Sequence, residues 1–512
     1  MTTTSPATET AALDAVAQAE LVRRGEVTPA ELTGWAIERI EELNPVLNAV
    51  ITPMFDRALA AAAATPRTGP LAGVPYLVKD LIAEVAGVPF SEGSAFLRGH
   101  VSHFDSELVL RLRRAGLVIV GKTSTPEFGM VPTCEPVRHG PTRNPWDTAR
   151  STSGSSGGSA AAVASRMVAM AHGTDLGGSL RYPASACGLF GLKPTRGRNP
   201  LGPEYGDAVS GWACEHAVTR TVRDSAVLLD ATAGPAPGDP YGPPAPARPF
   251  AAEVGRAPGR LRIGYTAATP GGIPPHPDCL AALDDAAALC SSLGHELVEA
   301  ELPGLTPEVG AAIGSVFHAA TAWVVEYWIR RLGRRPADDE LEPLTRAYWE
   351  MGQNVTASDY LLAIEDCQAF ARGVARFLTG IDVWLTPTMS APPALIGEIT
   401  STAQEPLRAL ERGSRTVAYA GVVANITGNP AMSVPLWWNP SGLPVGVHFL
   451  GRYGDEAALV RLASQLESAR PWSARMPPVI AGANSRHGPG TAGGRRWPPA
   501  PGRGCGPVSG SG

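Results

Sequence analysis

The chain has 512 residues, of which 44% are hydrophobic and 18% are charged, and its formal net charge at pH 7 is −5. This composition is typical of a soluble globular protein, and the length suits one large α/β domain with appendages. A negative chain offers no basic field to a polyanion, so we expect no nucleic-acid partner.

Seven cysteines are scattered along the chain without any C-x-x-C pair. An odd number of dispersed cysteines is typical of reduced thiols in the cytosol. The N-terminal segment has neither the basic start nor the apolar stretch of a secretory signal, and no run of about 18 apolar residues is evident. We therefore expect a cytoplasmic protein without a membrane partner.

The N-terminal region begins with polar residues 1–10, which are predicted to be disordered, and the folded domain is predicted to span 11–475. Two helical patterns follow. In the second, Thr28 and Glu31 form a capping-box pattern with proline at the first helical position. Apolar residues recur at helical spacing until Asn44-Pro45, which is expected to end the helix.

Residues 74–78 are predicted to form a buried strand that ends at Lys79. A lysine in this position can direct its ammonium group to water while its stem stays buried. Alternatively, burial lowers its pKa from about 10.4, so that the neutral amine can act as a base. The residues alone leave both interpretations open.

A strand–helix–strand unit continues with a helix over 105–115 and an apolar strand over 117–120. Residues 116–123, GLVIVGKT, match the phosphate-binding pattern G-x-x-x-x-G-K-[ST]. That pattern requires a loop between its glycines, whereas Leu-Val-Ile-Val is itself the strand. We therefore reject a nucleotide site here.

The stretch from Ser153 to Arg198 contains two turns rich in glycine and serine, separated by an apolar run that is typical of a buried helix leading into a strand. Glycine lets backbone N–H groups converge on a small anion, and the neighbouring serines supply hydroxyls. The turn at 176–179 could provide both a nucleophile and donors for an oxyanion. Surface loops of the same composition are an equally open interpretation.

These paired turns, with GTDLGGSLR from Gly173 and CGLFGLKPT from Cys187, resemble the signature region of the amidase signature family of serine hydrolases. In that family a lysine, a serine that follows a cis peptide bond and a second serine form the catalytic triad. Matched onto this chain, the resemblance implies Lys79, Ser155 and Ser179. One departure is visible, because Ser153-Gly154 stands where the family commonly has two glycines.

The resemblance also implies how the reaction proceeds. Neutral Lys79 takes a proton through Ser155, and Ser179 attacks an amide carbonyl to form an acyl-enzyme, which water then hydrolyses. The N–H groups of Leu176, Gly177, Gly178 and Ser179 would stabilise the oxyanion, and the main chain at Gly129 would contact the substrate. Asp175 and Arg181, which flank the nucleophile turn, are expected to orient it.

Beyond the signature region, strands are predicted over 261–265 and 296–301, with a helix over 281–293 between them. A helical region at 306–379 carries several aromatic residues, and the resemblance implies that such an insertion shapes the substrate pocket. His318 lies in it and is left out of the catalytic set. The Gly/Pro/Arg-rich tail at 482–512 is predicted to be disordered.

The expected fold is α/β, with a large mixed central sheet flanked by helices on both faces, as the resemblance implies. The expected function is an amidase that hydrolyses carbon–nitrogen bonds of a small linear or cyclic amide. No cofactor and no metal are expected, and a homodimer is a possible assembly. Two alternatives stay open: the amidase subunit of an aminoacyl-tRNA amidotransferase, and a catalytically silent scaffold of the same fold.

Overall fold

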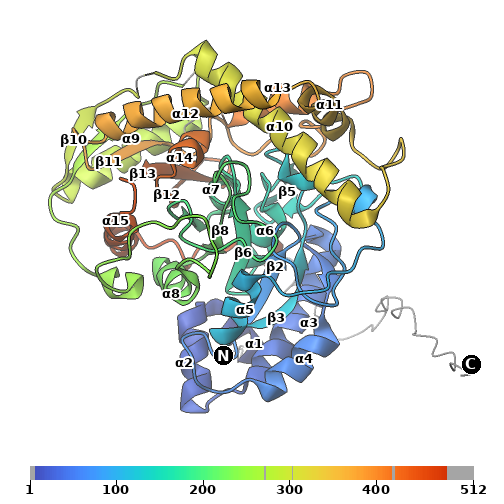
Figure 1. Cartoon of the computed structure of the whole chain (residues 1–512). Helices are drawn as coiled ribbons and strands as arrows, with labels where there is room; N and C mark the ends of the chain where they lie inside the picture. The colour runs from blue at the N-terminus through green and yellow to red at the C-terminus, as the bar shows by residue number, and fades with distance from the viewer. Residues whose placement is uncertain (1–5, 270–271, 303, 418–420, 481–512) are drawn as a thin grey trace, which may run out of the picture.

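The computed structural model describes residues 6–269, 272–302, 304–417 and 421–480 (Figure 1). Their strands form an 11-stranded mixed sheet in the order β1-β3-β2-β6-β8-β7-β12-β13-β11-β9-β10, and β4 pairs with β5 separately. The expected α/β fold with a mixed central sheet is thereby confirmed. The strands are β1 (Val50–Pro53), β2 (Pro75–Lys79), β3 (Val118–Thr123), β4 (Arg143–Asn144), β5 (Asp147–Ser151), β6 (Met170–Asp175), β7 (Phe190–Lys193), β8 (Cys214–Thr219), β9 (Arg262–Tyr265), β10 (Glu296–Glu299), β11 (Val383–Pro387), β12 (Ala431–Trp438) and β13 (Pro444–Leu450).

Helices lie on both faces of the sheet. The α-helices are α1 (Pro6–Ala12), α2 (Ala15–Arg24), α3 (Pro29–Leu47), α4 (Phe55–Ala64), α5 (Glu107–Arg114), α6 (Gly157–Ala164), α7 (Arg181–Cys187), α8 (Val222–Thr232), α9 (Pro277–Ser292), α10 (Pro307–Leu332), α11 (Pro343–Gly352), α12 (Ala357–Phe377), α13 (Arg408–Thr416), α14 (Gly421–Thr427) and α15 (Glu456–Ala469). Short 3₁₀ segments are η1 (Ala95–Leu97), η2 (Glu127–Gly129) and η3 (Phe250–Glu253).

The alternation of side chains along β2 decides which helices cover each face of the N-terminal half. Leu77 packs with α3, α4, α6 and α7, whereas Tyr76 and Val78 pack with α2 and α5 on the opposite face. Successive residues of a strand point to opposite faces, so a strand covered on both sides must be apolar throughout. This is why the run before Lys79 is continuously apolar.

The C-terminal half of the sheet is covered in the same way. Apolar residues of α8, α9 and α15 pack on one face, and those of α10, α12 and α14 pack on the other. Figure 1 shows α10, α11 and α12 together at the top of the view, far from α1–α5 at the bottom. The region expected at 306–379 thus forms three helices in one place.

The helix that begins after Thr28 is longer than predicted. Its capping box is confirmed, since Thr28 and Glu31 exchange the two expected hydrogen bonds. The stop at Asn44-Pro45 is wrong, because the helix continues through Pro45 to Leu47. The Asn44 side chain accepts hydrogen bonds from the Ala49 and Val50 N–H groups, at 2.8 Å each, so the chain is capped after the proline rather than before it.

Disorder over the whole of residues 1–10 is also corrected by the structure. Residues 6–10 belong to α1, and the Thr10 carbonyl accepts a hydrogen bond from the buried Gln18 side chain at 3.0 Å. Tertiary anchoring of this kind orders a segment whose composition alone favours disorder. Residues 1–5 and the tail at 482–512 lie outside the described residues.

Helix α10 is, among the described residues, long and apolar enough to cross a membrane by length and composition, although only 22% of that stretch is buried. No uninterrupted apolar run was expected, and Ser315 and His318 do interrupt it. The helix packs against α11 and α12, and it contributes Phe317, Thr321 and Trp323 to a pocket wall. By this test α10 gives only weak evidence of a membrane span.

A buried ion pair joins the end of the signature region to α15. Arg198 Nε lies 2.8 Å from Glu456 Oε1, Arg198 Nη2 lies 2.9 Å from Glu456 Oε2, and the same carboxylate accepts the Thr195 N–H at 2.9 Å. Both side chains are buried. Removing one partner of such a pair leaves an uncompensated charge in the interior.

We expect Glu456→Ala to lower the free energy of unfolding by about 3–5 kcal/mol, because it leaves the buried Arg198 guanidinium without its carboxylate partner. The measurement is the urea midpoint followed by circular dichroism. Glu20→Ala is the matched control, because Glu20 pairs with Arg23 on an exposed helix face, where little change is expected. Equal midpoints for the two variants would contradict the prediction.

Candidate active site

The site begins where two neighbouring parallel strands end. Strand β2 ends at Lys79, and β6 runs beside it, with Leu77 opposite Ala171. Because the strands are parallel, the residues after these partners lie at the same edge of the sheet, which brings Lys79 close to Thr174. The carboxyl ends of parallel strands are the usual edge for a binding site in α/β proteins.

The Lys79 amine is fully buried and surrounded by hydroxyl groups. Its Nζ lies 2.7 Å from Ser155 Oγ, 3.1 Å from Ser156 Oγ and 2.7 Å from Thr174 Oγ1. Burial lowers the pKa of Lys79 to about 7, against smaller opposing effects of nearby acidic groups. Near neutral pH the amine is therefore divided between its charged and neutral forms.

The hydrogen bonds of the Ser156 hydroxyl decide whether it donates to the Lys79 amine or accepts from it. The Ser156 hydroxyl donates to the Thr174 carbonyl at 3.1 Å and accepts the Thr174 N–H at 3.3 Å. Its only proton is thus used, so towards Lys79 it can only accept. A neutral amine that donates to Ser156 and Thr174 keeps its lone pair for the hydroxyl of Ser155.

The turn that carries Ser155 is tightly constrained. The Gly154–Ser155 peptide bond is cis, and a Cβ on Gly154 would lie 2.2 Å from the carbonyl oxygen of Thr133. Ser153 has φ 58°, a left-handed conformation that glycine adopts more readily. Ser153 therefore occupies the conformation that suits the glycine common in the family at that position.

The second turn, from Leu176 to Leu180, is held by Asp175. Its carboxylate accepts the N–H groups of Gly178 at 2.8 Å and Leu180 at 3.1 Å. It also binds Arg181 through two hydrogen bonds, of 3.0 and 2.8 Å. Burial alone would raise the pKa of Asp175, but the charge and hydrogen bonds of Arg181 hold it well below its usual range.

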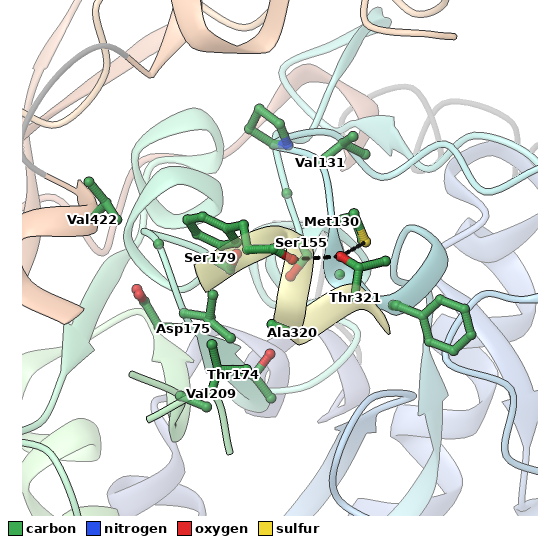
Figure 2. A pocket seen from close by; sticks show the side chains of 18 of the residues that line it. Met130, Val131, Ser155, Thr174, Asp175, Ser179, Val209, Ala320, Thr321 and Val422 are labelled. Carbon is green, nitrogen blue, oxygen red and sulfur yellow. Dashed lines mark hydrogen bonds between the residues drawn. The ribbon is translucent and has the colours of Figure 1, made fainter. Parts of the chain in front are cut away.

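The two turns meet at the floor of a cavity of about 530 Å³. The Ser156 N–H donates to the Ser179 carbonyl at 3.2 Å, and Figure 2 shows Ser155 and Ser179 side by side. The structure thus brings Lys79, Ser155 and Ser179 together. The walls are mainly apolar and include Leu81, Phe128, Val131, Phe317, Trp323 and Tyr348.

The backbone donors named from the sequence are not equivalent. The Gly178 N–H is engaged with Asp175, whereas those of Leu176, Gly177 and Ser179 donate no hydrogen bond within the described part of the chain. Gly129 lines the cavity, and a Cβ built on it would lie 3.2 Å from Ser155 Oγ. A side chain at residue 129 would therefore crowd the Ser155 hydroxyl.

Several side chains near the site had no role assigned from the sequence. Ser156 and Thr174 complete the hydroxyl set around Lys79, and their place inside the two Gly/Ser turns is the signal that could have found them. Glu92 lines the cavity although no motif points to it. His318, left out of the catalytic set, packs edge-on against Tyr348, with ring centroids 4.6 Å apart.

The rejected phosphate-loop match is also resolved by the structure. Gly121, Lys122 and Thr123 lie within β3, and the fully buried Lys122 Nζ is 2.5 Å from Asp80 Oδ1. Lys122 is therefore an internal ion-pair partner. Residues 116–123 form no phosphate loop.

Comparisons with known proteins show which family the chain belongs to. A sequence model of the family described as Amidase matches residues 31–460. The 6-aminohexanoate-cyclic-dimer hydrolase of Paenarthrobacter ureafaciens is 38% identical over 481 residues, covering 91% of this chain and 97% of that protein.

Solved structures show the same relationship. A 6-aminohexanoate cyclic dimer hydrolase complexed with substrate superposes with a TM-score of 0.87 at 36% identity, covering 92% of this chain and 99% of the other. A glutamyl-tRNA(Gln) amidotransferase subunit of Thermotoga maritima gives a TM-score of 0.69 at 27% identity, covering 86% and 92%. The chain therefore belongs to the amidase signature family and is an amidase, a hydrolase that acts on carbon–nitrogen bonds.

Proposed function

We propose that Lys79, Ser155 and Ser179 form the catalytic triad of a serine amidase. The observation that carries the proposal is the buried Lys79 Nζ lying 2.7 Å from Ser155 Oγ, and the lowering of the Lys79 pKa to about 7 by burial supports it. Ser155 passes a proton from Ser179 to Lys79 while Ser179 attacks the amide carbonyl. The relay then returns the proton to the leaving amine, and water hydrolyses the acyl-enzyme by the reverse path.

The oxyanion is stabilised by backbone N–H groups of the second turn. Leu176, Gly177 and Ser179 supply the donors, since they have no other acceptor among the described residues. Gly178 serves a different purpose, because its N–H fixes the turn to Asp175. Donors that are already oriented need no rearrangement when charge develops on the carbonyl oxygen.

The proposed substrate is a small linear or cyclic carboxamide. A cavity of about 530 Å³ with mainly apolar walls has the size and polarity of a small-molecule site. The named activity of the similar hydrolases, on the 6-aminohexanoate cyclic dimer, supports testing cyclic and linear amides of that acid first. A cytoplasmic location and a homodimeric assembly remain part of this proposal.

The purified chain is expected to hydrolyse simple amides without any other subunit or ATP, because all three proposed triad members and the cavity come from one chain. The measurement is ammonia or amine release from hexanamide and from 6-aminohexanoate oligomers. An amidotransferase subunit would instead need its partners, and a silent scaffold would show no release in either case.

A fluorophosphonate probe is expected to add once to the wild-type chain, and Ser179→Ala is expected to lose both the adduct and at least about 10⁴-fold in turnover. Intact mass spectrometry measures the adduct, and circular dichroism checks folding. Ser315→Ala is the matched control, since Ser315 lies on α10 outside the cavity and should keep the adduct. Retained turnover in purified Ser179→Ala would refute the assignment.

The pH dependence of kcat/KM is expected to show a limb near pH 7, with activity falling as pH falls. Below the pKa of about 7 Lys79 is protonated and has no lone pair to accept the proton, whereas above it the neutral base predominates. The measurement is the pH profile on a neutral amide, whose own charge does not change.

Glu92 needs a separate control because burial raises its pKa to about 7 as well. Glu92→Gln removes that titration and should leave the limb in place if Lys79 is the base. Loss of the limb in this variant would assign the titration to Glu92 instead.

A further inference from the structure

The charged groups along the cavity are few and of one sign. Of the lining residues, only Asp175 and Glu92 carry ionisable carboxyls, and no lysine, arginine or histidine lines the wall within the described part of the chain. Asp175 is neutralised by its ion pair with Arg181. Glu92 is thus the one lining carboxyl without a cationic partner among the described residues.

The carboxyl of Glu92 is buried, with 1% of the residue exposed, and it is held by two uncharged donors. The Trp328 indole N–H donates to Oε2 at 2.8 Å, and the Ile82 N–H lies 3.4 Å from Oε1. A carboxylate has about four acceptor positions, so the group keeps capacity for a further donor. A buried carboxylate without a counter-charge is costly, which favours a ligand that supplies one.

Nearby cations are committed to other carboxylates. Lys122 Nζ lies 2.5 Å from Asp80, and Arg331 Nη1 lies 2.6 Å from Glu84. Lys79 is held by its hydroxyl neighbours and does not itself line the cavity. None of these side chains forms an ion pair with Glu92 among the described residues, although the charge of Glu92 is one of the effects that oppose the lowering of the Lys79 pKa.

A chain of packed aromatic rings leads from Trp328, which holds Glu92, into the cavity wall: the Trp328 and Tyr327 ring centroids are 5.5 Å apart, and those of Tyr327 and Tyr205 are 5.3 Å apart. The Tyr205 and Trp323 ring centroids are 5.6 Å apart, both residues line the cavity, and Trp323 is 40% exposed, so a ligand from solvent can reach it. Burial, and next the charge of Glu92, raise the pKa of Tyr205 well above its usual value, as expected for close neighbours. The Phe128 N–H donates to the Glu92 backbone carbonyl at 2.8 Å, and Phe128 also lines the cavity.

We propose that Glu92, with the rings of Tyr205 and Trp323, forms a subsite for a primary ammonium group at the far end of the substrate chain. The proposal rests on the function proposed above and names a substrate class for it: amides whose chain carries an amine. An ammonium ion gains from a carboxylate and from aromatic faces at once. A chain that ends in a carboxylate meets no cation among the described lining residues and is disfavoured.

The first test measures binding without turnover. Calorimetry on the Ser179→Ala protein at pH 8 compares 6-aminohexanamide with hexanamide, which is the same chain without the amine. We expect the amine to bind about tenfold more tightly, and the advantage to vanish in Ser179→Ala/Glu92→Gln. Equal binding of the two amides to the parent protein would overturn the subsite.

Glu204→Gln is the matched control for a general attraction of cations. Glu204 is an exposed carboxylate at the same aromatic cluster, 2.9 Å from the Tyr327 hydroxyl, and it does not line the cavity. This change should keep the preference for the amine. If Glu204→Gln reduced the preference for 6-aminohexanamide as much as Glu92→Gln does, a direct contact between the ammonium group and Glu92 would be contradicted.

A second readout separates failure of the subsite from failure of the proposed function. The p-nitroanilides of 6-aminohexanoic, hexanoic and adipic acids present an ammonium, a neutral and a carboxylate end. The expected order of kcat/KM is ammonium, then neutral, then carboxylate. Cleavage of all three at similar rates would refute the subsite alone, whereas cleavage of none would refute the triad, and the binding data would still decide the subsite.

Discussion

The candidate site depends on the burial of one side chain, Lys79. Its amine lies at the end of an apolar strand, and its nearest neighbours are hydroxyl groups. A charged amine in this place would be poorly solvated, which is why its pKa falls to about 7. The strand must be apolar because helices cover both of its faces, so the fold itself creates the dry environment. The burial of β2 between two layers of helices therefore both stabilises the fold and lowers the pKa of Lys79.

The Asp175–Arg181 pair gives the turn from Leu176 to Leu180 its shape and ties it to the C-terminal half. Arg181 also donates to Asn425 Oδ1 at 2.8 Å and to the Gly421 carbonyl at 2.9 Å, and Asn425 donates to the Asp175 carbonyl at 2.8 Å. Every partner is buried and hydrogen-bonded, the condition under which a buried ion pair is tolerated. Residues about 250 positions apart thus hold the turn that carries Ser179.

The sequence predicted those features whose causes are local or whose motif is long. The capping box at Thr28, the strand ending at Lys79 and the paired turns at 153–198 each follow from neighbouring residues or from a family resemblance. The helix passing Pro45 does not follow from the pattern, because the Asn44 side chain caps the chain beyond it. The spacing of residues in the sequence does not predict that Thr174 lies beside Lys79 or that Glu92 lines the cavity. Both positions result from contacts between segments that are far apart in the sequence.

The floor and the walls of the cavity come from different elements of the fold. Its floor is built from two turns of small residues, which follow β5 and β6. Part of its wall comes from the loop that carries Glu92. Another part comes from α10, which contributes Phe317 and Trp323. These wall side chains lie outside the two turns, so their size and charge can change while the glycine and serine residues of the turns are kept. Under the proposed function, selectivity for the substrate chain is set at Glu92 and α10 and can change there, while the hydroxyl groups around Lys79 are kept.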